Sequence, residues 1–325
     1  MPTSPAQRRC VPPTTDEAII PRKPASVHGF VVVDKPVGIT SHDVVARIRR
    51  RFSERRVGHS GTLDPDATGV LIVALGNATR LLQFLGDLPK TYSGEVVFGT
   101  ATNTLDASGE VTATSDMSTL TIERVRKAAE SFVGDITQIP PMVSAIKVGG
   151  RRLHEIAREG GEVERAPRPV TIHRYVVGDV VDRVDGNPVV AIEVSCSSGT
   201  YVRTLAADLG AALGGFAHLR RLRRRAIGDF VVGATHDPAS IDSAPLQTAV
   251  AVMAHLDGVN IAMVAVDADT AVKVRNGRAF DELGAIDGRE GERRIVLNEK
   301  NELIAVYRRA VDAWRAEVVM PSALA

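Results

Sequence analysis

Hydrophobic positions along the chain fall into short runs that glycine- and proline-rich turns separate. The first clear run, residues 30–33, is apolar and β-branched, which predicts a strand. Thr40 follows a "KPVG" turn and precedes an acid by three residues, at Asp43, which predicts a capped helix start. The buried face of this helix is predicted from apolar residues at helical spacing, namely Val44, Val45, Ile48 and Phe52.

The same patterning predicts the remaining elements of a large N-terminal unit. Long alternation of parallel strands with helices is absent, so the sequence favours a mixed α+β sheet over a doubly wound one. Strands are predicted at 69–75, 91–98, 170–178, 188–196 and 226–233, and helices at 77–86, 121–132 and 201–213.

Two further segments differ from this unit in composition. Residues 1–28 are rich in proline and scattered charges, and we interpret them as a disordered extension. Residues 235–247 are rich in Pro, Ser, Ala and Asp and are typical of a linker. Beyond them, two apolar runs around a polar turn at Lys300 and Asn301 predict a hairpin, and "AWRAEVVM" predicts a third strand. We therefore expect 248–325 to form a small β-rich domain.

Composition narrows the class of protein. The 325 residues, 44% hydrophobic and 24% charged, are ordinary for a globular protein with one large and one small domain. The formal net charge is only +1, so a polyanionic partner must be held by a local basic patch. One of the two cysteines, Cys10, lies in the predicted extension and the other is Cys196, which argues against a structural disulfide. With no apolar run of about 18 residues, we expect a cytoplasmic protein that does not associate with membranes.

The stretch "GHSGTLDPDATGVL", residues 58–71, is where the candidate chemistry gathers. "DPDATG" resembles the start of an EF-hand calcium loop, but the position that should supply a bidentate acid is Leu75. "DPDAT" also matches the D-x-D-x-T pattern of haloacid dehalogenase-like phosphotransferases, in which two aspartates work with magnesium. That motif ends an apolar strand, whereas "GHSGTL" precedes it here. The phosphotransferase stays open as the alternative function.

Several motifs in order carry a more specific resemblance. "VVVDKPVGITSHD", "RRVGHSGTLDPDATGVLIVALGNATR", "KTY" and "SSGTYVRTLAADLG" together resemble the bacterial tRNA pseudouridine-55 synthases of the TruB family, over residues 29–237. The resemblance implies a pseudouridine synthase fold, with a mixed, largely antiparallel sheet flanked by helices and a thumb-like insertion at about 140–170. More weakly, 248–325 resembles the small PUA-like domain of that family.

The resemblance also implies a reaction and a partner. Enzymes of this family isomerise uridine 55 in the T-loop of tRNA, by breaking the N1–C1′ bond and rejoining the base through C5. The reaction gains no atoms and involves no redox step, so no cofactor or metal is expected. The target base is stacked in the RNA, so the enzyme is expected to flip it outward. The implied partner is the T-arm stem-loop of tRNA, bound by a monomer with no obligatory protein partner.

Carried over onto this sequence, the family motif assigns a role to nine residues. Asp64 corresponds to the nucleophile, Arg203 to the arginine that pairs with it, and Tyr92 to the tyrosine suited to proton transfer at C5. The other positions are predicted to contact substrate or support the site: His59 where the base leaves the stack, Tyr201 and Leu222 in the uracil pocket, Asp106 as a supporting acid, Lys35 in the opening turn, and Arg80 as a possible phosphate contact.

Two basic segments are candidates for holding the RNA backbone. One is "HLRRLRRRA", with five arginines between 220 and 225, and the other lies in the thumb-like insertion. The alternative for each arginine is a solvated surface position, and for Tyr92 and Tyr201 a place in the core. A third possible function is an RNA-binding chaperone in which these residues perform no catalysis.

Overall fold

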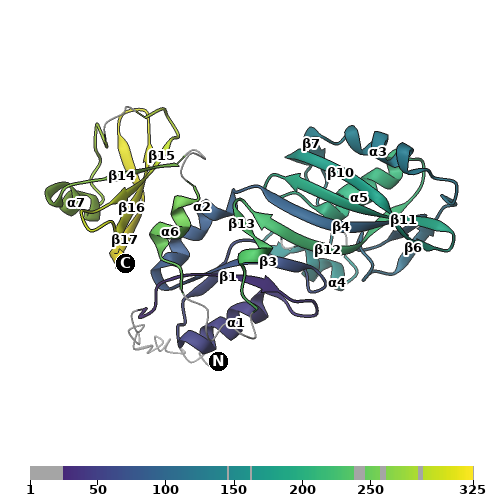
Figure 1. The fold of residues 1–325 in the computed structure, drawn as a ribbon, viewed down its shortest axis with the longest axis horizontal. Helices are drawn as coiled ribbons and strands as arrows, with labels where there is room; N and C mark the ends of the chain where they lie inside the picture. The colour runs from purple at the N-terminus through teal and green to yellow at the C-terminus, as the bar shows by residue number, and fades with distance from the viewer. Residues whose placement is uncertain are drawn as a thin grey trace, which may run out of the picture.

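The computed structural model describes residues 25–144, 146–161, 163–237, 246–256, 261–284 and 288–324, and its largest element is a mixed nine-stranded sheet. Seven strands follow the order β1-β3-β12-β4-β11-β10-β7, while β2 pairs with β3 and β13 with β12 (Figure 1). The strands are β1 (Gly29–Lys35), β2 (Val57–His59), β3 (Thr68–Leu75), β4 (Lys90–Phe98), β7 (Gly134–Gln138), β10 (Arg168–Val184), β11 (Asn187–Cys196), β12 (Ala217–Ile227) and β13 (Phe230–Val231). Among these described pairs only β3–β12 is parallel, which confirms the predicted mixed, largely antiparallel α+β sheet.

Strands β1 and β3 are buried on both faces. Because successive side chains of a strand point to opposite faces, the odd-numbered residues Val31 and Val33 pack against helix α1 (Ser41–Phe52). The even-numbered Phe30 and Val32 face a second apolar cluster, built with the 3-10 turn η1 (Gly76–Leu81) and helix α2 (Leu82–Gly86). The predicted helix at 77–86 is thus confirmed as a 3-10 turn that continues into an α-helix.

Helix α1 begins where the sequence predicts. The Thr40 hydroxyl accepts from the backbone N–H of Asp43 at 3.0 Å, and the Asp43 carboxylate accepts from the Thr40 N–H at 2.8 Å. This reciprocal capping box satisfies backbone donors that the first helical turn leaves free. The helix ends at Ser53, whose φ of 50° is left-handed. Of the predicted apolar face, Val44, Val45 and Ile48 are buried and Phe52 is partly buried.

The central strands carry two helices on one face, α3 (Ile122–Glu130) and α5 (Val202–Ala212). Both were predicted within two residues of these bounds, and the strands at 69–75, 91–98, 170–178 and 188–196 are confirmed as well. The sequence analysis did not predict the helices α6 (Ala249–Ala254) and α7 (Ala268–Arg275), the short strands β5 (Thr100–Thr102) and β6 (Val111–Thr114), or the group formed by strand β8 (Lys147–Val148), strand β9 (Arg151–Arg152) and helix α4 (Leu153–Arg158). The last three lie in the predicted thumb-like insertion.

One prediction about the chain around residue 230 was wrong, and the linker at 235–247 stays a prediction. The strand expected at 226–233 is instead β12 at 217–227, followed by the short β13 and the 3-10 turn η2 (Val232–Ala234). The described ends of the expected linker are hydrogen-bonded to β1: His236 N–H donates to Val32 O at 3.0 Å, and Gln247 N–H to Phe30 O at 2.8 Å. Residues 238–245 of that segment lie outside the described residues.

The N-terminal prediction falls largely outside the described residues, which begin at 25. Within the predicted extension, however, Ser26 N–H donates to the Glu54 carboxylate at 2.9 Å, and the His28 ring accepts from the Asn77 N–H at 3.1 Å. The ordered chain therefore starts before residue 29.

The C-terminal part of the chain forms a second sheet, with order β14-β15-β16-β17 (Figure 1). The predicted hairpin is confirmed, because β15 and β16 are antiparallel and Asn301 in their turn has a φ of 60°. The predicted third strand is β17. The elements are α6 (Ala249–Ala254), β14 (Ile261–Ala265), α7 (Ala268–Arg275), β15 (Arg293–Leu297), β16 (Leu303–Arg309) and β17 (Trp314–Leu324).

One apolar cluster runs from the large sheet into this C-terminal part. It contains Val32 of β1, Val252 of α6 and Val306 of β16. At its edge the Arg80 guanidinium donates to Val319 O at 2.9 Å, and the Arg293 guanidinium lies 5.5 Å from the centre of the Phe84 ring.

The domain boundaries given above stay predictions. No helix among the described residues is long and apolar enough to span a membrane.

Candidate active site

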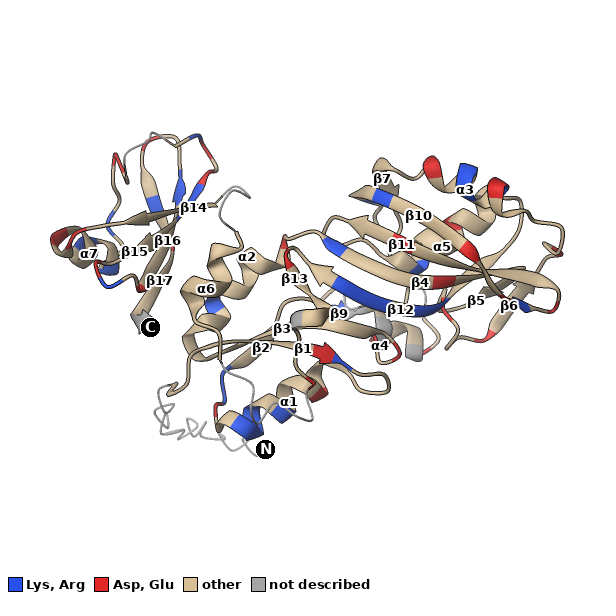
Figure 2. Cartoon of the chain, viewed as in Figure 1, with Lys and Arg blue, Asp and Glu red and all other residues tan. Residues whose placement is uncertain are grey.

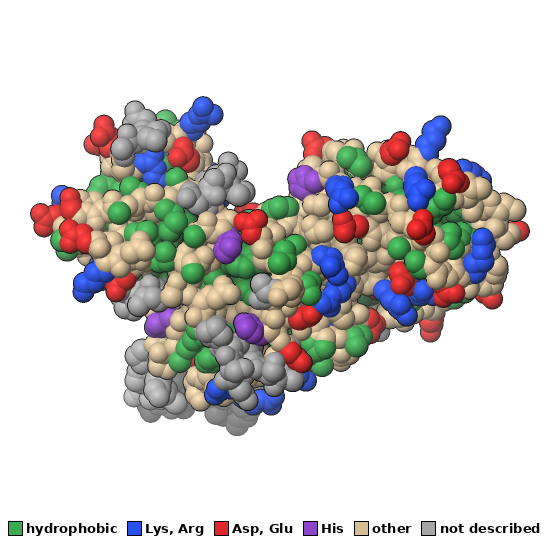
Figure 3. Space-filling view, viewed as in Figure 1, with side chains coloured by type: hydrophobic (Ala, Val, Ile, Leu, Met, Phe, Trp, Pro, Cys, Tyr) green, Lys and Arg blue, Asp and Glu red, His purple; other side chains and the backbone are tan. Residues whose placement is uncertain are grey.

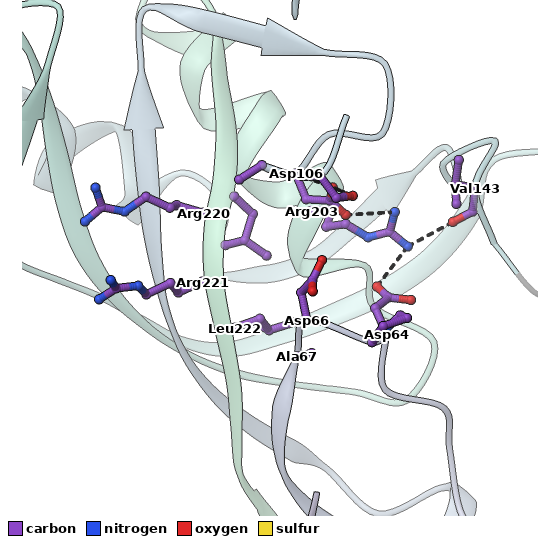
Figure 4. Close-up of a pocket in the computed structure, with 13 residues that line it drawn as sticks. Asp64, Asp66, Ala67, Asp106, Val143, Arg203, Arg220, Arg221 and Leu222 are labelled. Atoms are coloured by element: carbon purple, nitrogen blue, oxygen red, sulfur yellow. Dashed lines mark hydrogen bonds and ion pairs between the residues drawn. The ribbon is translucent and has the colours of Figure 1, made fainter. Parts of the chain in front are cut away.

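A cavity of about 240 Å³ opens beside the stretch that the sequence analysis singled out (Figure 4). Three separate parts of the chain supply its walls: residues 64–67 before β3, residues 106–108 after β5, and residues 219–222 of β12. Arg203 of α5 and Val143 of the insertion close the remaining side. Asp64, Arg203, Asp106 and Leu222 were all predicted site residues, and the fold brings them together here.

The loop that carries Asp64 is held by the chain on both sides of it. The Ser41 hydroxyl, at the start of α1, accepts from Leu63 N–H at 2.9 Å and lies 3.2 Å from Leu63 O. Gly38 N–H donates to Pro65 O at 3.0 Å, and Ala67 N–H to Asp64 O at 3.1 Å. The opening turn and the first helix thereby fix the position of Asp64.

Lys35 serves the same loop, and its predicted role as a substrate contact stays a prediction that the contacts below do not favour. Its side chain is fully buried. The ammonium donates to three backbone carbonyls, those of Pro36 at 2.9 Å, Ile39 at 2.7 Å and Pro65 at 3.1 Å. Since an ammonium has three N–H donors, none is left for RNA. Burial is the main cause that lowers the pKa of Lys35 to about 8, against the opposing attraction of Asp64 and Asp66.

Arg203 lies between two carboxylates and a carbonyl of the insertion (Figure 4). Its Nη2 atom is 3.1 Å from Asp64 Oδ2 and donates to Val143 O at 2.9 Å. Its Nη1 atom is 3.5 Å from Asp106 Oδ2 and donates to Thr104 O at 3.1 Å. Only 7% of the Arg203 side chain is exposed, so these partners replace water around the cation.

Asp106 is itself held by its neighbours. Its Oδ1 atom accepts from the hydroxyls of Thr104 and Ser108, both at 2.6 Å, and from Ser108 N–H at 3.0 Å. The preceding Leu105 has a φ of 62°, an unusual conformation for a non-glycine residue. The backbone around it is tied to β12, because Ala107 N–H donates to Leu219 O at 2.9 Å. Asp106 thus positions Arg203 from the side opposite Asp64.

The electrostatics of Asp64 combine opposing influences. Burial is the largest and raises the pKa of the carboxyl, although 46% of the side chain is still exposed to the cavity. Arg203 opposes this rise most strongly, with a smaller contribution from Lys35, whereas Asp106 and Asp66 add to it. Asp66 lines the same cavity and contributes part of this repulsion.

Arg224 is a buried cation that the sequence analysis assigned only to RNA binding. It is 1% exposed, and it donates to Val70 O at 2.7 Å and to Gly61 O of the Asp64 loop at 3.1 Å. In the register of β12 against β4 it lies directly opposite Tyr92, so the two side chains share a face of the sheet. Among the described residues no carboxylate is paired with it. Arg224 stands in a polar, arginine-rich run, and nothing in the pattern of that run indicated that this side chain is buried.

Tyr92 is half-buried on β4, and burial is the main cause that raises the pKa of its phenol. The adjacent Arg224 opposes the rise, both by its charge and by a hydrogen bond to the phenol. The ring also packs at the margin of the apolar cluster under α3 and α5. The Tyr92 side chain thus contacts both the apolar core and the charged Arg224.

His59 ends β2, just before the Asp64 loop, and contacts a histidine that the sequence analysis did not predict. The ring of His42, exposed at the start of α1, meets it edge-on with centroids 5.6 Å apart. Burial, with the nearby His42 and Arg224, lowers the pKa of His59 to about 4, so the imidazole is neutral at neutral pH. Its buried Nδ1 atom has no hydrogen-bond partner among the residues that the structure describes.

Tyr201 and Arg80 lie outside the lining of this cavity, as do the predicted site residues His59, Lys35 and Tyr92. Tyr201 precedes α5 and exchanges backbone hydrogen bonds with the Gln138 amide, at 3.0 and 3.3 Å. Arg80 is exposed, but its guanidinium donates to β17 at Val319 O. In this structure Arg80 therefore joins the large sheet to the C-terminal sheet.

The arginine run of β12 is largely neutralised within the protein. Arg220 pairs with Glu95 and Asp182, both at 2.7 Å, and Arg221 with Glu95 at 3.2 Å. Arg223 makes a bidentate contact with Asp34, with nitrogen–oxygen distances of 2.5 and 3.0 Å. In the space-filling view, blue and red side chains accordingly lie next to one another over this sheet (Figure 3). Arg225 is exposed, and among the described residues it is not paired with a carboxylate. The run as a whole is therefore a poor candidate for a phosphate-binding surface.

The structure also bears on the two alternative motifs. Strand β3, not a helix, follows "DPDATG", and Leu75 lies in that strand, so the EF-hand interpretation was wrong. The D-x-D-x-T pattern requires a strand that ends at the first aspartate, but here the loop precedes a strand. In the part of the chain that the structure describes, no group of three or more His, Cys, Asp or Glu side chains is arranged to hold a metal ion.

Comparison with known proteins agrees with the geometry. The family model described as "TruB family pseudouridylate synthase (N terminal domain)" matches residues 49–202. The chain is 51% identical to "tRNA pseudouridine synthase B" of Mycobacteroides abscessus over 211 residues, which cover 64% of this chain and 70% of that protein. It is 46% identical to the protein of that name in Rhodococcus jostii over 267 residues, covering 79% and 83%.

A solved structure shares the fold. In the "Crystal Structure of a Cbf5-Nop10-Gar1 Complex", one chain superposes with a TM-score of 0.68 at 25% identity, covering 90% of this chain and 84% of that one. The fold and the matched sequence define a pseudouridylate synthase. Within that class, the chain belongs to the TruB family.

Proposed function

We propose that this protein isomerises uridine 55 in the T-loop of tRNA to pseudouridine, with Asp64 as the catalytic carboxylate. The observation that carries the proposal is the Asp64–Arg203 pair at 3.1 Å on the wall of a cavity. The relatives named above are tRNA pseudouridine synthases, which supports tRNA as the substrate. We further propose a monomeric cytoplasmic enzyme that needs no obligatory protein partner.

Breaking the N1–C1′ bond requires an anionic group near C1′. A carboxylate can add to C1′ or stabilise a cationic sugar, as it does in glycoside hydrolysis. Arg203 favours the ionised form of Asp64 and aims it into the cavity, while Asp106 fixes Arg203 from behind. The aspartate can therefore act as an anion in surroundings that otherwise favour its neutral form.

After the base turns, its C5 proton has to leave. We propose that Tyr92 takes part in this transfer, and that the Arg224 cation beside the phenol lowers the cost of charge on its oxygen. Leu222 would contact the uracil from the cavity wall. His59, neutral and beside the Asp64 loop, would occupy the place from which the nucleotide is flipped out.

The direct test is tritium release from T-arm RNA labelled at uracil C5, with EDTA present, for the wild type and Asp64→Asn. Release by the wild type alone supports isomerisation through Asp64. Loss of the wild-type activity on adding EDTA, together with equal need for Asp64 and Asp66, would instead favour a magnesium phosphotransferase. Tight tRNA binding without release from either protein would favour the RNA chaperone.

A further inference from the structure

Three arginines at and just beyond the C-terminal end of α1 have no carboxylate partner in the part of the chain that the structure describes. Arg49, Arg50 and Arg55 line an open hollow of about 390 Å³, together with Ser53 and Glu54. All three arginines are exposed, and none is paired with a carboxylate among the described residues. In Figure 2 blue residues lie together at this end of α1.

The one acid in the hollow is already engaged. Glu54 is 5% exposed, and its carboxylate accepts from the backbone N–H groups of Ser26 at 2.9 Å and Arg56 at 2.9 Å. Three arginines therefore share the hollow with one carboxylate that is engaged by the backbone, and the Arg49 guanidinium donates to Val57 O at 3.1 Å. Like charges this close repel each other and destabilise the folded chain. Basic residues in the last turn of a helix are stabilised by the helix dipole. Arg55 gains no such stabilisation, because α1 ends at Phe52.

The same helix connects this hollow to the candidate active site. Its first residue, Ser41, is hydrogen-bonded to Leu63 of the Asp64 loop, and His42 contacts His59. Nine residues separate Ser41 from Arg50, which at 1.5 Å per residue is about 14 Å. A duplex carries roughly one phosphate charge for every 1.7 Å of its axis. A stem that enters the site with its loop is therefore long enough to bring phosphates to these arginines.

We propose that Arg49, Arg50 and Arg55 form an α1 basic surface that binds backbone phosphates of the RNA stem next to the modified loop. The inference rests on the proposed function, since it takes the substrate to be a stem-loop RNA. The chain's own N-terminal residues are a poorer occupant, because residues 1–24 carry Arg8, Arg9, Arg22 and Lys23 against only Asp16 and Glu17. Three arginines without base-edge partners would contribute affinity and orientation but no base readout.

The test measures binding of a T-arm stem-loop RNA by fluorescence anisotropy over a series of salt concentrations. The test variant is Arg50→Gln/Arg55→Gln. Its matched control is Arg124→Gln/Lys127→Gln, which removes two exposed cations from helix α3. We expect the test variant to lower the slope of log Kd against log salt by about 1 per arginine, and to bind about tenfold more weakly at low salt. Arg50→Lys/Arg55→Lys should retain most of the slope.

Activity separates this inference from the proposed function. At saturating RNA the test variant should keep the wild-type kcat, because neither arginine lines the cavity. A wild-type slope in the test variant, or an equal loss in the α3 control, would overturn the α1 basic surface and leave the proposed function intact. Failure of the wild type to isomerise T-arm RNA would contradict the proposed function, whatever the slopes of log Kd against log salt.

Discussion

Arg203 contacts Asp64 through the same nitrogen that binds the insertion. Nη2 lies 3.1 Å from Asp64 Oδ2 and donates to Val143 O at 2.9 Å, while Nη1 faces Asp106. The position of the candidate catalytic carboxylate therefore depends on three separate parts of the chain. The predictions below test whether this arrangement controls activity.

Replacing Arg203 should change the pH dependence of the reaction as well as its rate. In Arg203→Met, Asp64 loses the main influence that opposes the rise of its pKa. The acid limb of kcat/KM should then move to higher pH, with a loss of at least about 100-fold at neutral pH, as is typical when a preorganised charge is removed. Arg203→Lys should move the limb less. An unchanged acid limb in Arg203→Met would contradict the assigned pairing.

Asp64→Asn should be inactive but more stable at neutral pH. Burial raises the pKa of Asp64 in the folded protein above its ordinary value. Folding therefore favours the neutral form of the carboxyl. Its contribution to the free energy of unfolding is fully present below the ordinary pKa and is lost as pH rises through the raised pKa. Urea denaturation at pH 7 should show a gain for Asp64→Asn that shrinks toward pH 4. Asp66→Asn, at an exposed position, is the control; a less stable Asp64→Asn would contradict the sign.

Lys35→Met should destabilise the fold and loosen the Asp64 loop. The substitution leaves three carbonyls without a donor in a fully buried position. A cost of about 2–4 kcal/mol is expected, since each unsatisfied buried group costs about 1–3 kcal/mol and relaxation recovers part of it. Urea denaturation measures the change, with the exposed Lys300→Met as control. Equal stability of the two variants would show that Lys35 does not hold the loop.

Arg224 and Tyr92 should act as a unit. Because they face each other across β12 and β4, Arg224→Met should reduce kcat strongly, and the loss should overlap with that of Tyr92→Phe. A double-mutant cycle on kcat tests this, with circular dichroism to confirm that each variant is folded. Additive losses would mean that Arg224 acts only through the Gly61 and Val70 carbonyls.

Local signals were enough to predict much of this fold. The capping box at Thr40 and the spacing of Val44 and Ile48 defined α1, because both depend on residues close in sequence. The same holds for the hairpin of β15 and β16. Asp64, Arg203 and Asp106 were identified by family-like motifs, and the fold places them around one cavity.

Strand β12 shows where local signals fail. "AHLRRLRRRAI" has almost no apolar alternation, and its strand conformation depends on partners distant in sequence: Glu95 for Arg220 and Asp34 for Arg223. The burial of Arg224 likewise requires the carbonyls of Gly61 and Val70. A count of arginines therefore predicted RNA binding at β12, whereas Arg50 and Arg55 at the end of α1 are the ones without a carboxylate partner among the described residues.

The central claim is that the Asp64 site converts one uridine of the T-loop. It is tested most directly by incubating unmodified tRNA with the wild type or Asp64→Asn, then mapping pseudouridine at single-nucleotide resolution after carbodiimide treatment. The account predicts one carbodiimide adduct at position 55 with the wild type and none with Asp64→Asn, although both bind the tRNA. Pseudouridine at position 55 made by Asp64→Asn, or its absence with the wild type, would contradict the account.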